Sequence, residues 1–270
     1  MSQKRQSRIP HLLRHERCQI ATLTRDYPAS QVIPVHSHNQ DQLVYASRGV
    51  MTVRTSDGAW VVPTHRAVWI PASVPHTICM SGMVAMRTLY LEPRLAKALP
   101  RGCCVVNVTP LLRELILHAC TLLTLKKTNQ AERHLIDLII DQLGTIRTVP
   151  LQLPNPGDPR ALKVARALLA DPGDRRSLSR LCKTGGAGKR TVQRLFQREV
   201  GMTFNKWRQQ LRLMQALRLL AEGAKVTRVA LESGYGTPSA FISMFKKTLG
   251  TTPTLYFRTK ETGQPRENAE

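Results

Sequence analysis

Acidic side chains are scarce in this chain of 270 residues, where 18 Asp and Glu stand against 40 Lys and Arg for a formal charge of +22. A charge of this size needs a polyanion to neutralise it, and nucleic acid is the commonest polyanion in a cytosol. Aromatic residues are also few, at 5%, which leaves few large anchors for a core. The apolar share of 42% is enough for packed domains, and the length suits two of them.

Long apolar runs and paired-cysteine motifs are missing as well. No stretch approaches the roughly 18 apolar residues that a membrane span needs. The basic start from Met1 to Arg8 leads into no apolar run, so we expect no secretory signal. The six cysteines show no C-x-x-C spacing, and adjacent Cys103 and Cys104 cannot easily form an ordinary bridge. These absences predict reduced thiols in a cytoplasmic protein that has no membrane partner.

Short β-rich runs fill residues 31–91, about ten residues apart and separated by turn residues. Six such runs predict a small antiparallel sandwich or barrel. From Pro110 the apolar residues recur at helical spacing instead, which predicts two amphipathic helices. We therefore expect a β-barrel domain over residues 1–109, followed by a helical pair over 110–148.

Residues 149–159 contain four prolines and no helical period, which is typical of a linker. Beyond them the pattern is helical throughout, and residues 177–258 carry fifteen basic and three acidic side chains, a net charge of +12. The sequence thus predicts a two-domain α+β fold, in which the β-barrel and its helices precede an all-α domain over 160–260. The last residues, 261–270, are expected to form a flexible tail.

The helical domain contains a helix-turn-helix pattern at about 177–200. Ser177 can cap a short helix, and Gly185 and Gly186 permit the tight turn between two helices that cross steeply. In the second helix the apolar stripe is Val192, Leu195, Phe196 and Val200, and the opposite face carries Lys189, Arg190, Gln193, Arg194 and Gln197. Arginine and glutamine have the fork geometry that reads guanine and adenine edges in the major groove.

The same pattern returns about 49 residues later, at about 226–249. Gly234-Tyr-Gly236 forms the turn, Thr237 caps the next helix, and Pro238 is its first residue. The residues expected to face inward are Ala240, Phe241, Met244, Phe245 and Leu249, and those expected to face outward are Ser239, Ser243, Lys246 and Lys247. Two such units in tandem favour DNA binding over a purely structural role.

Between the two units, Thr203 to Glu222 form one continuous helical pattern. Twenty residues at 1.5 Å each give a helix of about 30 Å, and one turn of duplex DNA is about 34 Å. A rigid rod of that length would set two recognition helices into successive major grooves on one face of the duplex.

Residues 160–258 resemble the DNA-binding domain of the AraC/XylS family of bacterial transcription regulators. The segments that carry the match are Arg190-Thr-Val-Gln-Arg-Leu-Phe196, Gly201-Met-Thr-Phe-Asn-Lys-Trp207, Gly234-Tyr-Gly-Thr-Pro-Ser-Ala-Phe241, Phe245, and Gly250-Thr-Thr-Pro253 followed by Tyr256. The resemblance implies seven helices. It also implies base contacts near the start of each recognition helix, which here fall on Arg190, Gln193, Arg194, Ser239 and Ser243.

Two features depart from the family pattern. The first recognition helix usually opens with a Ser cap and then Pro, where this chain has Gly188 and Lys189, and a Gly cap is weaker by a few tenths of a kcal/mol. On the outer face of the second unit, Ser239 and Ser243 have short side chains where long donors would be needed to reach the bases. We therefore expect Lys246 and Lys247 to contact phosphates there, with little direct base readout.

The N-terminal domain carries a second resemblance. His36-Ser-His38 followed by Gln42, and then Pro71-Ala-Ser-Val-Pro-His76, resemble the two motifs of a cupin barrel. In that family two histidines, a glutamate and a third histidine bind a divalent metal, so the three histidines are candidate ligands and Gln42 stands where the glutamate would. Since alternate residues of a strand share a face, His36 and His38 could both face the barrel lumen. We expect that the protein requires no cofactor. The alternatives for these four residues are that they bind a divalent metal or that they simply line an effector pocket.

The preferred hypothesis is a sequence-specific DNA-binding regulator of a nearby transport or catabolic operon, acting as activator or repressor at a promoter or operator. In the family the barrel senses a small-molecule effector and the helices after it often form a homodimer, although here they could simply cover the barrel. RNA polymerase would be a partner of an activator. The alternatives are a metal-dependent cupin enzyme, such as a dioxygenase or isomerase, and a sequence-blind architectural DNA-binding protein. The lack of a carboxylate at Gln42 argues against the enzyme.

Overall fold

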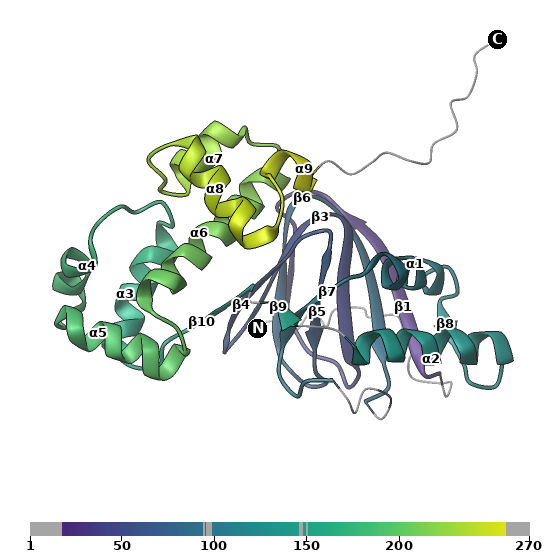
Figure 1. The fold of residues 1–270 in the computed structure, drawn as a ribbon. Coiled ribbons are helices and arrows are strands. Elements are labelled where there is room, and N and C mark those ends of the chain that lie inside the picture. The colour runs from purple at the N-terminus through teal and green to yellow at the C-terminus, as the bar shows by residue number, and fades with distance from the viewer. Residues whose placement is uncertain (1–17, 94, 96–98, 146–147, 150, 258–270) are drawn as a thin grey trace, which may run out of the picture.

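The computed structural model describes residues 18–93, 95, 99–145, 148–149 and 151–257. Figure 1 shows a sheet-rich N-terminal domain beside an all-helical C-terminal domain, which confirms the expected two-domain α+β fold. The tail predicted at 261–270 lies outside the described residues. No helix in the described ranges has both the length and the apolar character that a membrane crossing requires.

Within the described residues, one antiparallel sheet of ten strands builds the N-terminal domain. The strands are β1 (Ile20–Tyr27), β2 (Val32–His36), β3 (Asp41–Thr55), β4 (Gly58–Val62), β5 (Arg66–Ile70), β6 (His76–Leu91), β7 (Cys104–Asn107), β8 (Thr124–Leu125), β9 (Thr148–Val149) and β10 (Gln152–Pro154). Their hydrogen-bonded order is β8-β1-β6-β3-β5-β7-β9, with β2 on β6, β4 on β3, and β10 on β4.

The two long strands make this sheet curl. β3 pairs with β6 along most of its length, and the register shifts on either side of Arg48. Gly49 has a φ angle of +78°, and a Cβ at this position would clash with the Met83 carbonyl on β6. Irregularities of this kind bend a strand and increase its twist. The sheet rolls around a core, but among the described strands its pairing order ends at β8 and β9, so it is an open roll where the sequence predicted a barrel.

Helices α1 (Pro110–Ala119) and α2 (Gln130–Gly144) cover one face of the sheet. Their fully buried residues are Leu112, Ile116, Ala119, Ile136 and Ile139. These side chains share a core with Tyr45 and Trp69 of the sheet. The predicted helical pair therefore covers the sheet, and it still exposes Leu111 at 49% and Leu138 at 39%.

The segment that connects the two domains pairs with the sheet. After β9, strand β10 pairs with β4, so that Gln152 lies opposite Trp60. The indole of Trp207, on the long helix of the C-terminal domain, donates a hydrogen bond of 2.8 Å to the Pro154 carbonyl. The proline-rich segment predicted as a linker thus contacts both domains.

Seven α-helices form the C-terminal domain over its described residues, 159–257, as the family resemblance implied. They are α3 (Pro159–Ala170), α4 (Leu178–Gly185), α5 (Lys189–Leu195), α6 (Phe204–Ala221), α7 (Val226–Glu232), α8 (Pro238–Leu249) and α9 (Pro253–Phe257), with a π-helical turn η2 (Phe196–Val200) after α5. The rod between the two units is α6, whose 18 residues span about 27 Å. Figure 1 shows α6 running from the α3–α5 group to the α7–α9 group.

Candidate nucleic-acid interface and histidine cluster

The first helix-turn-helix unit follows the predicted pattern closely. The Ser177 hydroxyl accepts a hydrogen bond from the Arg180 N–H at 3.4 Å and so caps α4. Gly186 ends that helix with a φ angle of +68°, a conformation that favours glycine. Gly188 is the N-cap of α5 and supplies no side-chain bond, as the departure from the family pattern predicted. The inward residues of the second helix are buried as expected: Val192, Leu195, Phe196 and Val200.

All five residues predicted for the outer face of this unit are exposed: Lys189, Arg190, Gln193, Arg194 and Gln197. In the described part of the chain no ion pair or hydrogen bond holds the side chains of Arg190, Gln193 or Arg194. Gln197 lies in the π-helical turn, where the ring of Phe196 packs against the rings of Phe204 and Trp207, each at 5.3 Å. The exposed donors are therefore available to a ligand.

The second unit is built in the same way. The Thr237 hydroxyl accepts a hydrogen bond from the Ala240 N–H at 3.2 Å, and Pro238 opens α8. Phe241 and Phe245 are fully buried. The residues predicted to face outward are all exposed: Ser239, Ser243, Lys246 and Lys247.

Ala240 is exposed too, and the expectation that it faces inward is wrong. The buried contact of α8 is filled by the two phenylalanine rings, which lie 5.7 Å apart. This leaves the Ala240 methyl group on the outer face, beside Ser239 and Ser243.

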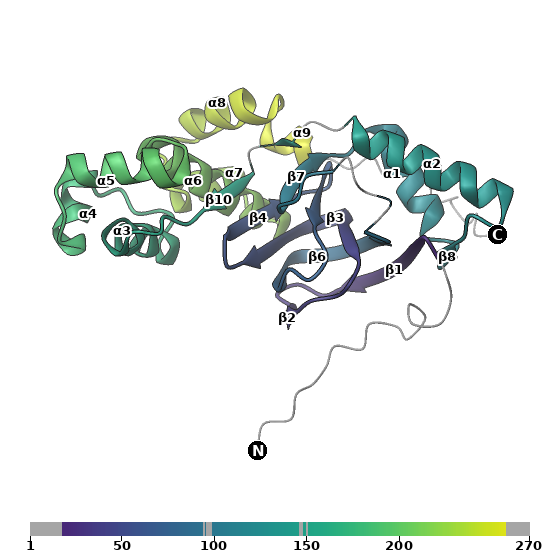
Figure 2. The ribbon, with the colours of Figure 1, turned by 90° about the horizontal axis from the view of Figure 1, so that it is seen from below.

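The two recognition helices share one side of the domain. Figure 2 shows α5 and α8 along the same upper edge of the C-terminal domain, with α6 between the two units. Arg190 of α5 and Ser239 of α8 are both exposed.

A contact that the sequence analysis missed joins the two units directly. The loop between α3 and α4, residues 171–177, reaches the second unit. There Arg175 donates a hydrogen bond of 2.6 Å to the Tyr235 carbonyl. On α6, Arg212 donates to the Asp174 carbonyl at 2.8 Å, and Arg208 donates to the same carbonyl. We call this set of contacts the arginine latch.

The arginine latch is packed tightly enough to fix the orientation of its parts. The Arg212 guanidinium lies 5.7 Å from the centre of the Tyr235 ring, in the range of a cation–π contact. Gly234 has a φ angle of +77°, and a Cβ there would lie 2.7 Å from the Gly173 carbonyl oxygen as well as from the guanidinium, so this position requires glycine. Burial lowers the pKa of Arg208 and of Arg212, although a guanidinium stays charged. The only signal for the latch in the sequence is the spacing of four residues between these arginines.

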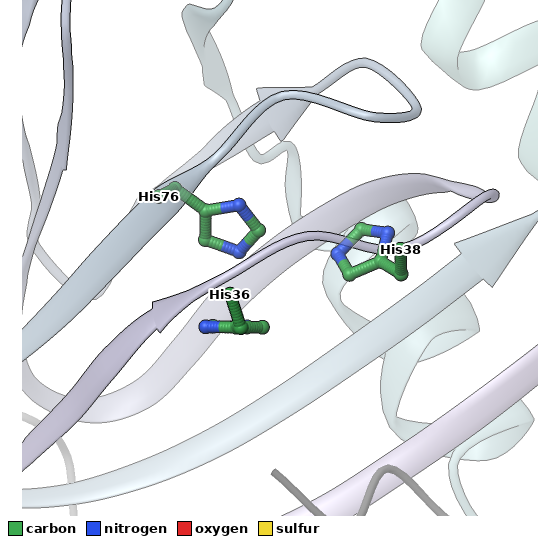
Figure 3. A group of neighbouring side chains, drawn as sticks. All are labelled: His36, His38 and His76. Carbon is green, nitrogen blue, oxygen red and sulfur yellow. The ribbon is translucent and has the colours of Figure 1, made fainter. Parts of the chain in front are cut away.

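The three candidate histidines come together in the N-terminal domain. Their ligand atoms all lie within 4.8 Å of one another, and Figure 3 shows the three rings beside one another. His36 ends β2 and lies opposite His76, the first residue of β6. Because β2 ends at His36, strand alternation does not orient His38. The His38 ring is held instead by a hydrogen bond of 2.7 Å between its Nδ1 and the Gln40 carbonyl.

Each of these rings has a backbone carbonyl beside its Nδ1. The partners of His36 and His76 are Pro34 and Val74, both at 2.9 Å. A proton on Nδ1 leaves Nε2 with a free lone pair, the form in which imidazole binds a metal. The Nε2 of His76 is buried and has no hydrogen-bond partner within the described structure.

Burial favours the neutral form of His36 and of His76. It lowers the pKa of His76 to about 4 and also lowers the pKa of His36. The Nε2 of His38 already faces an oxygen, since Gln42 Oε1 lies 2.9 Å from it. The Gln42 side chain must therefore turn away before His38 can bind an ion through that nitrogen. The cluster therefore fits a metal ion to which His36 and His76 offer free ring nitrogens and His38 offers one only after Gln42 has moved.

Comparisons with known proteins cover both domains. The AraC-like ligand binding domain matches residues 17–144, and a helix-turn-helix domain matches residues 181–259. The HTH-type transcriptional regulator NimR of Escherichia coli strain K12 is 34% identical over 232 residues, which are 86% of this chain and 85% of NimR.

Two further likenesses are narrower or looser. The regulator RipA of Corynebacterium glutamicum is 33% identical over 117 residues, 43% of this chain and 35% of RipA. Among solved structures, fatty-acid-bound ToxT of Vibrio cholerae covers 92% of this chain and 98% of its own, at 11% identity and a TM-score of 0.38.

Proposed function

The chain belongs to the AraC-type family of helix-turn-helix transcriptional regulators, and from that premise we propose that α5 and α8 read one operator together. The observation that carries this proposal is the pair of exposed recognition faces on one side of the domain, joined by α6. A spacer of about 27 Å and an operator bent slightly toward the protein would bring both helices into successive major grooves.

The two units would divide the work of recognition. Arg190, Gln193 and Arg194 have the donors that suit guanine and adenine edges, so the first unit would supply most of the sequence choice. In the second unit Ser239 and Ser243 reach less far, and the Ala240 methyl group suits a thymine methyl. Lys246 and Lys247 would hold phosphates beside it.

The change Arg194→Ala tests the base-reading role. We expect it to cost about 1–3 kcal/mol on the preferred operator and to relax base preference at one position, because a bidentate contact is lost. Gel-shift titrations on the preferred operator, on single-base variants and on random duplex measure both effects. Arg166→Ala, an exposed change on α3, is the matched control. An equal loss on preferred and random DNA would assign Arg194 to the phosphates instead.

The N-terminal domain would couple this binding to a small molecule. The exposed Leu111 and Leu138 of α1 and α2 support a homodimer contact in addition to their cover of the sheet. RNA polymerase would be a further partner if the chain activates transcription. Catalysis is not proposed, because the histidine cluster has Gln42 in place of a carboxylate.

The histidine cluster would hold a divalent cation through His36, His38 and His76. The buried, unpartnered Nε2 of His76 supports this assignment. When bound, a cation such as Zn²⁺ would supply an open coordination position for an oxygen of the effector.

Metal analysis of the purified chain tests the cluster. We expect close to one equivalent of bound Zn²⁺ after incubation and dialysis, and a loss of nearly all of it in His76→Ala, since two ligands hold zinc poorly. Gln42→Glu should tighten binding by adding a negative ligand. His118→Ala, an exposed histidine on α1, is the control. Zinc retained by His76→Ala would show that the cluster only lines a pocket.

A further inference from the structure

A cavity of about 650 Å³ lies between the two helix-turn-helix units, and its size is within the range of small-molecule sites. Its walls come from the loop between α3 and α4, from α6, from the Gly234-Tyr-Gly236 turn and from α8. The residues on which its chemistry depends are Arg175, Asn205, Arg208, Gln209, Arg212 and Tyr235. We call it the latch cavity, because its three arginines also form the arginine latch.

The latch cavity is distinct from the two recognition faces. On α8 it takes Met244, a half-buried side chain, and on α6 it takes the half-buried Arg208 and Arg212. A duplex contacts residues on a protruding face, whereas a hollow with half-buried guanidinium groups suits a small molecule. The lining includes none of the described outer-face residues of the two units, which are Lys189, Arg190, Gln193, Arg194, Gln197, Ser239, Ser243, Lys246 and Lys247.

The positive charge of this cavity is not neutralised by carboxylates. The carboxylate of Asp174, the nearest candidate, accepts from Arg176 instead, from Nε at 2.8 Å and from Nη2 at 2.6 Å. Arg175, Arg208 and Arg212 form no ion pair among the described residues, and their hydrogen bonds go to backbone carbonyl groups. No acidic side chain is part of the described lining.

The three guanidinium groups of the cavity also repel one another. Burial is the larger cause that lowers the pKa of Arg208, and repulsion from Arg212 adds to it. Repulsion from Arg175 adds in the same way to the effect of burial on the pKa of Arg212. Because a guanidinium stays charged despite such shifts, an anion placed beside the three groups would offset their repulsion.

Unengaged donors surround these charges. Asn205 and Gln209 are exposed, and their side-chain amides make no hydrogen bond within the part of the chain that the structure describes. Arg175 is exposed too, and its hydrogen bond of 2.6 Å to the Tyr235 carbonyl uses only Nη2. The other nitrogens of its guanidinium therefore remain available to a ligand.

This donor set favours a phosphate group over a carboxylate. One carboxylate pairs with the fork of a single guanidinium. A phosphate monoester has a charge of about −1.5 to −2 and three strong acceptor oxygens, which suit several cations and amides at once. The Tyr235 ring and Met244 add apolar surface on which the organic part of such a molecule can pack.

We propose that the latch cavity binds the phosphate group of a small phosphorylated molecule, no larger than a nucleotide. Arg175 and the amides of Asn205 and Gln209 donate to the phosphate oxygens. The half-buried guanidinium groups of Arg208 and Arg212 attract the anion while they stay in the arginine latch. The site belongs to the helical domain alone, so that binding depends neither on the histidine cluster nor on the proposed function.

Isothermal titration of the full chain with inorganic pyrophosphate, at constant ionic strength, tests the site. We expect one saturable site, and a loss of affinity of roughly 10- to 100-fold in Arg175→Gln, as expected for charged hydrogen bonds. Gln209→Glu leaves the arginine latch intact and should cost at least about tenfold, because its carboxylate repels the phosphate and pairs with the arginines.

Two variants outside the cavity are matched controls. Gln197→Glu changes the net charge by the same amount as Gln209→Glu, and Arg166→Gln by the same amount as Arg175→Gln. Both controls should retain the original affinity within about twofold, a difference of roughly 0.4 kcal/mol. If each cavity variant loses no more affinity than its control, phosphate binds diffusely over a basic surface and the site is overturned.

Competition identifies the ligand class. Acetate at the same ionic strength should not displace pyrophosphate, and displacement as strong as that by inorganic phosphate would overturn the choice of phosphate. A chain saturated with duplex DNA should still bind one pyrophosphate. Complete displacement by the duplex would assign the cavity to the DNA interface and overturn a small-molecule site. If the chain binds no duplex at all, the proposed function fails, and the titrations without DNA still decide the site.

Discussion

Raising the salt concentration from 50 to 200 mM should weaken DNA binding by about 10³- to 10⁵-fold, as expected for a protein that contacts six to ten phosphates. The net charge of +12 over residues 177–258 is the reason, since each neutralised phosphate releases counterions. Filter binding or fluorescence anisotropy at several salt concentrations gives the slope of log Kd against log salt.

Lys246→Ala identifies one source of that slope. It should weaken binding to all duplexes alike and reduce the slope by about 0.9, the value for one phosphate. Arg101→Ala removes an exposed positive charge from the N-terminal domain and should leave the slope unchanged. A slope near zero for the original chain would contradict a phosphate-dominated interface, whatever the sequence preference.

The outer face of each recognition helix could be predicted because it follows from local periodicity. The stripe from Val192 in α5 to Val200 in η2 is apolar at helical spacing, so the polar residues between its members were expected to face solvent. The histidine cluster could be predicted only by resemblance, because its members come from β2, a loop and β6. Its hydrogen bonds, including the one between Gln42 and His38, depend on side-chain geometry that no spacing encodes.

Other features depended on contacts between distant segments. The sheet was predicted as a barrel because strand number and spacing do not decide whether the last strands meet. Ala240 was predicted inward because an alanine fits either face, and the two neighbouring phenylalanines fill the buried contact instead. The arginine latch joins residues of α6 to a loop more than thirty positions earlier in the chain. Charged residues on a helix more often face solvent, so the pattern gave no reason to expect Arg208 and Arg212 to be partly buried.

Arg212→Met should lower affinity for the complete operator by at least about tenfold. The change removes a hydrogen bond from a charged donor to the Asp174 carbonyl, a type of bond that contributes about 1.5–3 kcal/mol, together with the contact on the Tyr235 ring. Without it the loop between α3 and α4 is held to the turn of the second unit by Arg175 alone, so the joint between the two units is looser. Binding to an operator in which the second half-site is scrambled should change less than about twofold, a difference of roughly 0.4 kcal/mol.

Operators with altered half-site spacing distinguish a role of Arg212 in positioning the two units from a role in stabilising the fold alone. If Arg212 fixes the orientation of the two units, Arg212→Met should tolerate operators with one base pair inserted or removed better than the original chain does, because a looser joint loses its preference for one spacing. The salt slope should stay the same, since Arg212 donates to backbone carbonyl groups and not to phosphates. Arg212→Lys keeps the charge but lacks the planar fork, so it should resemble the methionine variant. A uniform loss on complete and scrambled operators, with unchanged spacing preference, would mean that Arg212 only stabilises the fold, and a lower slope would place it on the DNA.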